Sequence, residues 1–417
     1  MLKGFLINMN IFFLLFILAC PPLMVLITSY GFTRDPVNWR KWLPLFVLIF
    51  FLIAYSYNPQ SIPDLTRYFQ MLQDIQGLSF SNVNLYFNDS LYLKNFIFWI
   101  ISNSKDVHIL PAVATATVYG VSGYILCDTA ENENMVKQIT WYLLAMILAF
   151  PIIGIINNVR NVWAFALLAM GIYRDLLKKN RNLVTILLYI LPCFIHSASI
   201  VIVFLRFICI FFSRLSNLFK ILLLSLIPLL SLFIDLLYRI SNKFPKYVSN
   251  FIITMHSYLY ETNSQYAISI STSEVQKIEK IFAMVATMFI LVMTYTLLKK
   301  GCKENQKYYS FVFLLGIIVL SLHVFIVPHY WRFFLLLMML AYPVLFEFKK
   351  IYLNSDSFLK SNIIVINYYL FFCFSIIYGM ADAWKSRGLI DIGNFVVSFT
   401  FNNIYVVIFT FFKGFFM

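Results

Sequence analysis

The stretch NLVTILLYILPCFIHSASIVIVFLRFICIFFS, residues 182–213, decides how this chain is threaded. It is apolar over most of its length, and Pro192 and His196 lie near its centre. One long helix would hold His196 in the middle of a bilayer, whereas a hairpin that turns near His196 gives two spans. The choice matters because it sets the side to which every later loop belongs. Proline loosens a helix, so we favour the hairpin.

The composition of the whole chain is that of a membrane protein. Of its 417 residues, 61% are hydrophobic and 12% are charged, and the mean hydropathy is +0.81. A soluble domain carries about 25% charged residues, so this chain has too few charges to cover a surface in water. The apolar runs are long and do not alternate with polar residues as barrel strands do. We expect an all-α, polytopic transmembrane helical bundle, with residues 1–417 as a single integral membrane domain.

Apolar runs near 20 residues mark the candidate spans. They predict about 12 or 13 spans, namely 5–29, 43–57, 107–127, 137–155, 158–174, 182–197, 198–213, 220–237, 280–298, 308–327, 331–347, 362–380 and a doubtful 396–412. The first run is longer than a signal-peptide core, so we interpret it as a retained helix.

Basic residues orient the bundle, because loops rich in lysine and arginine stay in the cytoplasm. The clearest such loops are 174–181 and 299–307. Placing both inside puts two long polar segments outside, 58–106 and 238–279, provided that 182–213 is a hairpin. The net charge of +14 follows from these loops, so nucleic acid is not an expected partner.

The usual signals of metal and nucleotide chemistry are missing from the sequence. The six cysteines are scattered and form no CxxC pair or His/Cys cluster. No DxD, HExxH, Walker loop or GxSxG stands in a suitable context. We therefore expect no cofactor and no metal.

The ionisable residues that remain as candidates gather on the predicted outer side. They are Asp64, Arg67 and Tyr68 in the first outer segment, Arg160 at a helix start, His196 at the hairpin turn, and His329 and Arg332 at a later turn. These residues come from four separate parts of the chain yet share one depth in the membrane. A helical bundle can bring them together around one pocket.

Most of these candidates also have a structural interpretation. Asp64 and Arg67 suit an ion pair in the first turn of a helix, and His196 suits a satisfied core histidine. His329 and Arg332 flank Tyr330 and Trp331, as an interfacial anchor would. Arg160 is different, because a lone cation at a helix start opposes the helix dipole and an anionic ligand would explain it. We interpret His256 and His323 as structural.

Arginines beside a carboxylate and an imidazole suit a substrate that carries a phosphate or diphosphate. A lipid-linked donor fits, since its tail would lie among the helices and its headgroup would meet the outer loops. Its diphosphate is a good leaving group. The enzyme then needs arginines to stabilise the developing charge and a base to take a proton from the attacking hydroxyl. Asp64 and His196 both qualify as that base.

At these residues the chain resembles the bacterial repeat-unit polymerases of surface polysaccharides, the Wzy and EpsG-like proteins. Asp64 and Tyr68 match an outer-loop aspartate followed by aromatics, although Leu65 replaces one aromatic. RNVWA, beginning at Arg160, matches the family's Arg-Gln-x-x-Ala helix start with asparagine for glutamine. FIHSA, containing His196, resembles Phe-His-x-Ser with an extra residue before the histidine and the serine directly after it. Arg332 stands at a late position like one that the family uses.

The resemblance implies a GT-C-like polymerase architecture in a bacterial inner membrane, with the active site facing the periplasm. The implied reaction moves a growing glycan from undecaprenyl pyrophosphate onto an incoming lipid-linked repeat unit of O-antigen or capsule. The implied partners are undecaprenyl-pyrophosphate-linked oligosaccharides, the lipid bilayer and a chain-length regulator. Alternatives are an O-antigen ligase, another lipid-linked glycosyltransferase or an acyltransferase, and a flippase or transporter. A flippase predicts polar groups on both sides of a cavity, whereas here they lie on one side.

Overall fold

All the regular elements in the described part of the chain are helical, as the long apolar runs predict. The computed structural model describes residues 21–57, 63–89, 91–212, 235–245, 248–250, 252–253, 256, 274–300, 303–325, 330–353 and 358–386. Its main helices are α2 (Pro21–Arg34), α3 (Trp39–Tyr55), α4 (Pro63–Asp74), α5 (Phe80–Phe87), α6 (Tyr92–Asn103), α7 (Ile109–Asn132), α8 (Ile139–Ala149), α9 (Ile152–Asn157), α10 (Val159–Ile172), α11 (Leu183–Cys193), α12 (Ser199–Phe212), α17 (Glu274–Lys300), α18 (Gln306–Phe325), α19 (Tyr330–Phe348) and α20 (Phe358–Ser386). Short 3₁₀ turns are η1 (Pro36–Asn38), η2 (Val136–Gln138), η4 (Ser241–Lys243) and η5 (Lys303–Asn305), and π-helical turns are η3 (Tyr173–Leu177) and η6 (Lys349–Leu353).

Four of the helical segments are long and apolar enough to cross a membrane: Pro36–Tyr55, Ile109–Asn132, Lys277–Lys300 and Trp331–Tyr352. Shorter apolar helices stand beside them. The described part of the chain is therefore an all-helical bundle, and the sequence as a whole has the composition of a membrane protein. The predicted span 396–412, most of 220–237 and the start of 5–29 lie outside the described residues.

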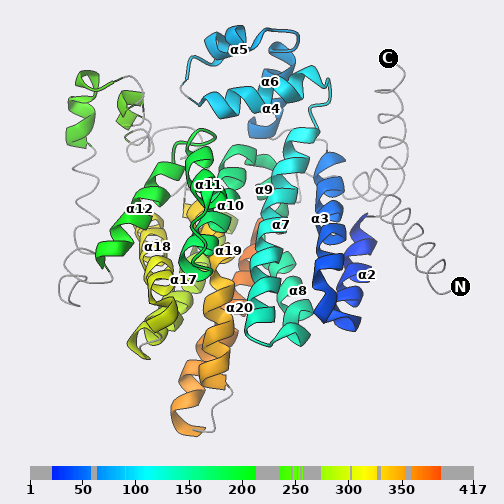
Figure 1. The fold of residues 1–417 in the computed structure, drawn as a ribbon, viewed down its shortest axis with the longest axis vertical. Helices are drawn as coiled ribbons and strands as arrows, with labels where there is room; N and C mark the ends of the chain where they lie inside the picture. The colour runs from blue at the N-terminus through cyan, green and yellow to red at the C-terminus, as the bar shows by residue number, and fades with distance from the viewer. Residues whose placement is uncertain are drawn as a thin grey trace, which may run out of the picture.

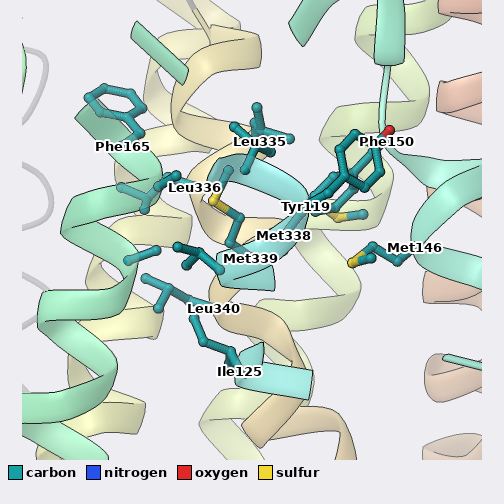
Figure 2. Close-up of a cluster of buried hydrophobic side chains, with 14 of the residues drawn as sticks. Tyr119, Ile125, Met146, Phe150, Phe165, Leu335, Leu336, Met338, Met339 and Leu340 are labelled. Carbon is teal, nitrogen blue, oxygen red and sulfur yellow. The ribbon is translucent and has the colours of Figure 1, made fainter. Parts of the chain in front are cut away.

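Helix α19 lies at the centre of the bundle. It contacts α7, α10, α17 and α18, and 83% of its apolar window is buried, against 39% for α17. Figure 2 shows Leu335, Leu336 and Met339 of α19 among side chains of neighbouring helices. A helix that is apolar on all sides is buried by other helices or by lipid, and the high burial of α19 shows that other helices cover most of it. Arg332, in the first turn of α19, therefore enters at the centre of one end of the bundle.

Residues 182–213 form a hairpin, as the sequence analysis favoured. Helix α11 ends at Cys193, one residue after Pro192, and α12 begins at Ser199. Just after α10, the Asp175 carboxylate accepts hydrogen bonds from Tyr189 of α11 and Arg206 of α12. The turn between α11 and α12 instead meets the start of α10. Helix α11 therefore runs back along α10, and α12 returns in the opposite direction.

A break between α8 and α10 positions Arg160. Helix α8 stops at Ala149, and Phe150 is extended because it precedes Pro151. The chain makes one short helix, α9, and then turns at Asn158, whose side-chain amide donates to the Gly154 carbonyl at 3.1 Å. Helix α10 starts at once with Val159 and Arg160. The reversal thus places a basic residue at the end of the bundle rather than within it.

The predicted outer segment 58–106 contains three helices, α4, α5 and α6, which lie together above one end of the bundle in Figure 1. We call these three helices the cap, and the bundle end beneath them the cap end. The helical signal in α4 is the buried series Leu65, Tyr68 and Leu72, which recurs every three or four residues. Because polar residues lie between them, the segment has no long apolar run and its apolar content did not mark it as a helix. Of the second segment, 238–279, the structure describes η4, a few residues around it and the first residues of α17.

The opposite end of the bundle, which we call the far end, gathers the basic loops. Lys178 pairs with Asp128 at 2.6 Å, and Lys350 pairs with Glu133 at 2.7 Å. The ammonium group of Lys300 lies over the Tyr352 ring, 4.9 Å from its centroid. The two basic loops that oriented the sequence therefore meet at the same end of the bundle.

Candidate functional site

The first contact of the site joins the start of α10 to the cap. Arg160 Nε donates a hydrogen bond to the Tyr68 hydroxyl at 2.9 Å, and its guanidinium carbon lies 5.2 Å from the centroid of that ring. Tyr68 is buried and packs edge-on against Phe98 of α6. Because packing fixes the Tyr68 ring, its contact with Arg160 fixes the orientation of the guanidinium group. Tyr68 and Arg160, predicted separately, thus form one unit.

The second contact joins α10 to α19 and to the hairpin turn through Asn161. Its side-chain amide satisfies both neighbours when the oxygen faces Arg332 and the nitrogen faces His196. In this orientation the oxygen accepts from Arg332 Nε at 3.0 Å and from Nη1 at 3.2 Å, and the nitrogen donates to His196 Nε2. One neutral side chain therefore bridges an arginine and a histidine that the sequence placed at the same depth.

His196 is only 4% exposed, and donors face both of its ring nitrogens. The Ala198 backbone N–H points at Nδ1, 3.1 Å away, and the Asn161 amide faces Nε2. A neutral imidazole has one acceptor nitrogen and one N–H, so it accepts from only one of these donors at a time. Consequently His196 can take a proton at Nε2 only if the Asn161 amide turns away.

Helix α6 of the cap touches the hairpin turn directly. The backbone N–H of Lys94 donates to the Phe194 carbonyl at 3.1 Å. This bond attaches the cap to the hairpin turn at Phe194, which precedes His196 by two residues. As a result the cap, the hairpin turn and the start of α10 meet at one place.

Lys94 itself is a buried cation, with only 3% of its side chain exposed. Its ammonium group pairs with Asp89 and lies 4.1 Å from the centroid of the Phe87 ring. Burial lowers the pKa of Lys94 to about 8, against the opposing effect of Asp89, and the nearby charge of Arg160 lowers it further. Lys94 and Arg160 are therefore close enough to repel each other.

The Asp64–Arg67 pair lies at the edge of this site. Arg67 Nη2 is 3.2 Å from Asp64 Oδ1, and both side chains are substantially exposed. This is the helix pair that gave these residues a structural interpretation. Arg67 also lies over Tyr68, with its guanidinium carbon 5.6 Å from the ring centroid, so the pair adjoins the Tyr68–Arg160 unit.

The other histidines named in the sequence analysis are His256, His323 and His329. His329 and the side chain of His323 lie outside the described residues. His256 stacks on Tyr238 with ring centroids 3.8 Å apart, and its Nε2 is 3.3 Å from Asp235. These contacts agree with its structural interpretation.

The sequence analysis missed three polar residues here: Lys94, Asp89 and the side chain of Asn161. Lys94 stands in the apolar, aromatic run 91–101. A lone cation in such surroundings, like Arg160, is a signal that could have identified it. Asn161 entered only as part of a motif, because an uncharged side chain does not stand out in an apolar sequence as a charged one does.

Other kinds of site are less well supported in the described part of the chain. No group of three or more His, Cys, Asp or Glu side chains there is arranged to hold a metal ion. A cavity of about 170 Å³ lies at the far end, lined by residues that include Thr129, Lys178 and Tyr309. That cavity contains none of the predicted site residues.

Comparison with known proteins adds no assignment: no protein-family model, curated protein or solved structure matches the chain.

Proposed function

We propose that this chain is a bacterial polysaccharide polymerase, a membrane glycosyltransferase that acts on polyprenyl-pyrophosphate-linked glycans. One observation carries the proposal. Tyr68, Arg160, His196 and Arg332 come from four separate segments, and contacts through Asn161 and the cap gather them at one end of the bundle. Basic side chains beside an aromatic surface suit a diphosphate joined to a sugar.

The proposed orientation places the cap end outside the cell, within a GT-C-like bundle of about 12 or 13 spans in the inner membrane. Support comes from the far end, where the basic residues of both long loops gather, as the cytoplasmic side of a membrane protein requires. The donor's lipid tail would then lie among the helices with its diphosphate at the cap end.

In the proposed reaction, a hydroxyl oxygen of the lipid-linked repeat unit attacks the anomeric carbon of the growing glycan. The new carbon–oxygen bond forms as the bond to the diphosphate breaks, and the electron pair leaves with the diphosphate. Arg160 and Arg332 stabilise the charge that develops on that leaving group. The hydroxyl proton passes to Asp64 or to His196, and His196 accepts it at Nε2 once the Asn161 amide has turned.

Alanine substitutions at Arg160 and Arg332 test the proposal. Membranes that contain each variant are given the undecaprenyl-pyrophosphate-linked repeat unit of the source strain, and chain length is followed on gels. We expect polymer formation to fall by at least about a hundredfold while the protein stays in the membrane. Arg181→Ala, at an exposed arginine of the far end, is the matched control and should give normal ladders. Normal ladders from both cap-end variants would overturn the proposed function.

A further inference from the structure

The buried pair of Lys94 and Asp89 needs an explanation that packing does not give. Lys94 is 3% exposed and Asp89 is 32% exposed, so the pair has one buried and one accessible member. An apolar side chain at a buried position is often as stabilising as an ion pair or more so. Here the buried cation also faces repulsion from Arg160. A fold that needed only a filled space would not place a lysine here.

The surroundings of the pair hold both partners in fixed positions. Asp89 Oδ1 accepts from the Leu91 backbone N–H at 3.1 Å and from Asn95 Nδ2 at 3.3 Å, while Oδ2 faces the Lys94 ammonium. The Lys94 backbone is anchored to Phe194 of the hairpin turn. A preorganised ammonium group therefore lies beside Arg160, with one carboxylate as its partner.

We propose that Lys94 is a third substrate-binding cation of this site, and that Asp89 holds it until the donor diphosphate takes the carboxylate's place. This inference rests on the proposed function. A diphosphate carries more negative charge than one carboxylate, so it competes well for an ammonium group that lies in the positive field of Arg160. Lys94 contacts the diphosphate, whereas Asp89 is a positioning residue that keeps Lys94 aimed at the site and lowers the cost of its burial.

The test measures binding of undecaprenyl pyrophosphate to the full-length protein in nanodiscs. Lys94→Met should weaken binding about tenfold or more, the effect of losing a charge-assisted hydrogen bond. Lys105→Met, at an exposed lysine that follows α6, is the matched control and should bind as the unsubstituted protein does.

The pH profile separates binding from folding. The pKa of Lys94 is lowered to about 8, so its charge is present below pH 8 and is lost as the pH rises through that value. Binding by the unsubstituted protein should fall between about pH 7.5 and pH 9. Lys94→Arg keeps its charge throughout this window, so its binding should stay level. A residue with a merely structural role would give the two proteins the same profile.

The outcomes separate the two proposals. If Arg160→Ala and Arg332→Ala lose binding while Lys94→Met binds normally and the Lys94→Arg profile matches that of the unsubstituted protein, the inference about Lys94 is wrong and the proposed function stands. If Arg160→Ala and Arg332→Ala also bind normally, the proposed function itself is wrong. Weaker binding by Lys94→Met with a level profile for Lys94→Arg supports both.

Discussion

Two arginines at each end of the bundle are held in different ways. At the far end, Asp175 binds Arg206 at 2.6 Å and Arg181 at 2.7 Å. At the cap end, Arg160 donates to the Tyr68 hydroxyl at 2.9 Å and Arg332 donates to the Asn161 amide oxygen at 3.0 Å. Carboxylates therefore neutralise Arg181 and Arg206, whereas neutral oxygens accept from Arg160 and Arg332. The contrast holds for these four arginines and not for whole ends, because Arg174 of the far end donates to the Thr185 hydroxyl and the Asn182 amide oxygen and Arg67 of the cap pairs with Asp64.

Under the proposed function, this difference separates a structural charge from a substrate-binding one. An ion pair satisfies both partners and leaves little attraction for a third charge. A tyrosine hydroxyl or an amide oxygen satisfies the geometry of a guanidinium group without cancelling its charge. Arginines held in this second way can still bind an anion strongly. In the proposed site, the neutral Asn161 amide therefore leaves the charge of Arg332 available to a substrate.

The largest expected effect is at the far end, where Asp175→Asn breaks a buried pair. Asp175 is 6% exposed and Arg206 is 12% exposed, so the substitution leaves a cation buried without a counter-ion. We expect a loss of about 3–5 kcal/mol of unfolding free energy, measured by denaturant titration of the purified protein in detergent micelles.

Arg181→Ala is the internal control for that prediction, because Arg181 binds the same carboxylate but is 61% exposed. It should change stability by no more than about 1 kcal/mol. Equal losses for the two variants would show that the far-end pairs do not act as structural charges in the way proposed here.

Asn161→Asp converts the cap end to the far-end arrangement. The new carboxylate should pair with Arg332, so the protein should remain at least as stable while polymer formation falls about a hundredfold. Both quantities are measured on the same preparation, by thermal unfolding and by chain-length analysis. Full activity in this variant would contradict the idea that Arg332 needs a neutral partner.

Asn161→Gln keeps the neutral amide and is the matched control. Glutamine is also the residue that the resembling polymerases carry after the arginine of this motif. We expect Asn161→Gln to retain most of its activity, because its longer amide can still reach both Arg332 and His196.

The sequence predicted the parts of this molecule that depend on local pattern. Apolar runs marked the helices, and Pro192 together with the basic loops favoured the hairpin that the structure contains. Arg160 stood out because a cation at a helix start is unusual. Depth in the membrane then suggested that Arg160, His196 and Arg332 lie together, and the contacts through Asn161 agree.

The remaining parts depend on tertiary contacts that a sequence does not reveal. The cap helices were predicted only as a polar segment, because their stability comes from burying one face against their neighbours. Lys94 became a site residue only because α6 binds the hairpin turn at Phe194. Asn161 bridges Arg332 and His196, which come from distant segments, and the orientation of its amide sets both contacts. Each of these features follows from packing rather than from local spacing.

The smallest expected effect comes from Tyr68→Phe, which keeps the ring beside Arg160 and removes only the hydroxyl. Losing one hydrogen bond costs about 1 kcal/mol, so kcat/KM for polymer formation should fall about fivefold. Tyr86→Phe is the control on the cap, because its hydroxyl donates to Asp74 rather than to a site arginine, and its kcat/KM should not change. If Tyr68→Phe also leaves kcat/KM unchanged, ring packing alone orients Arg160, and the role of neutral oxygens at the cap end would then rest on Asn161.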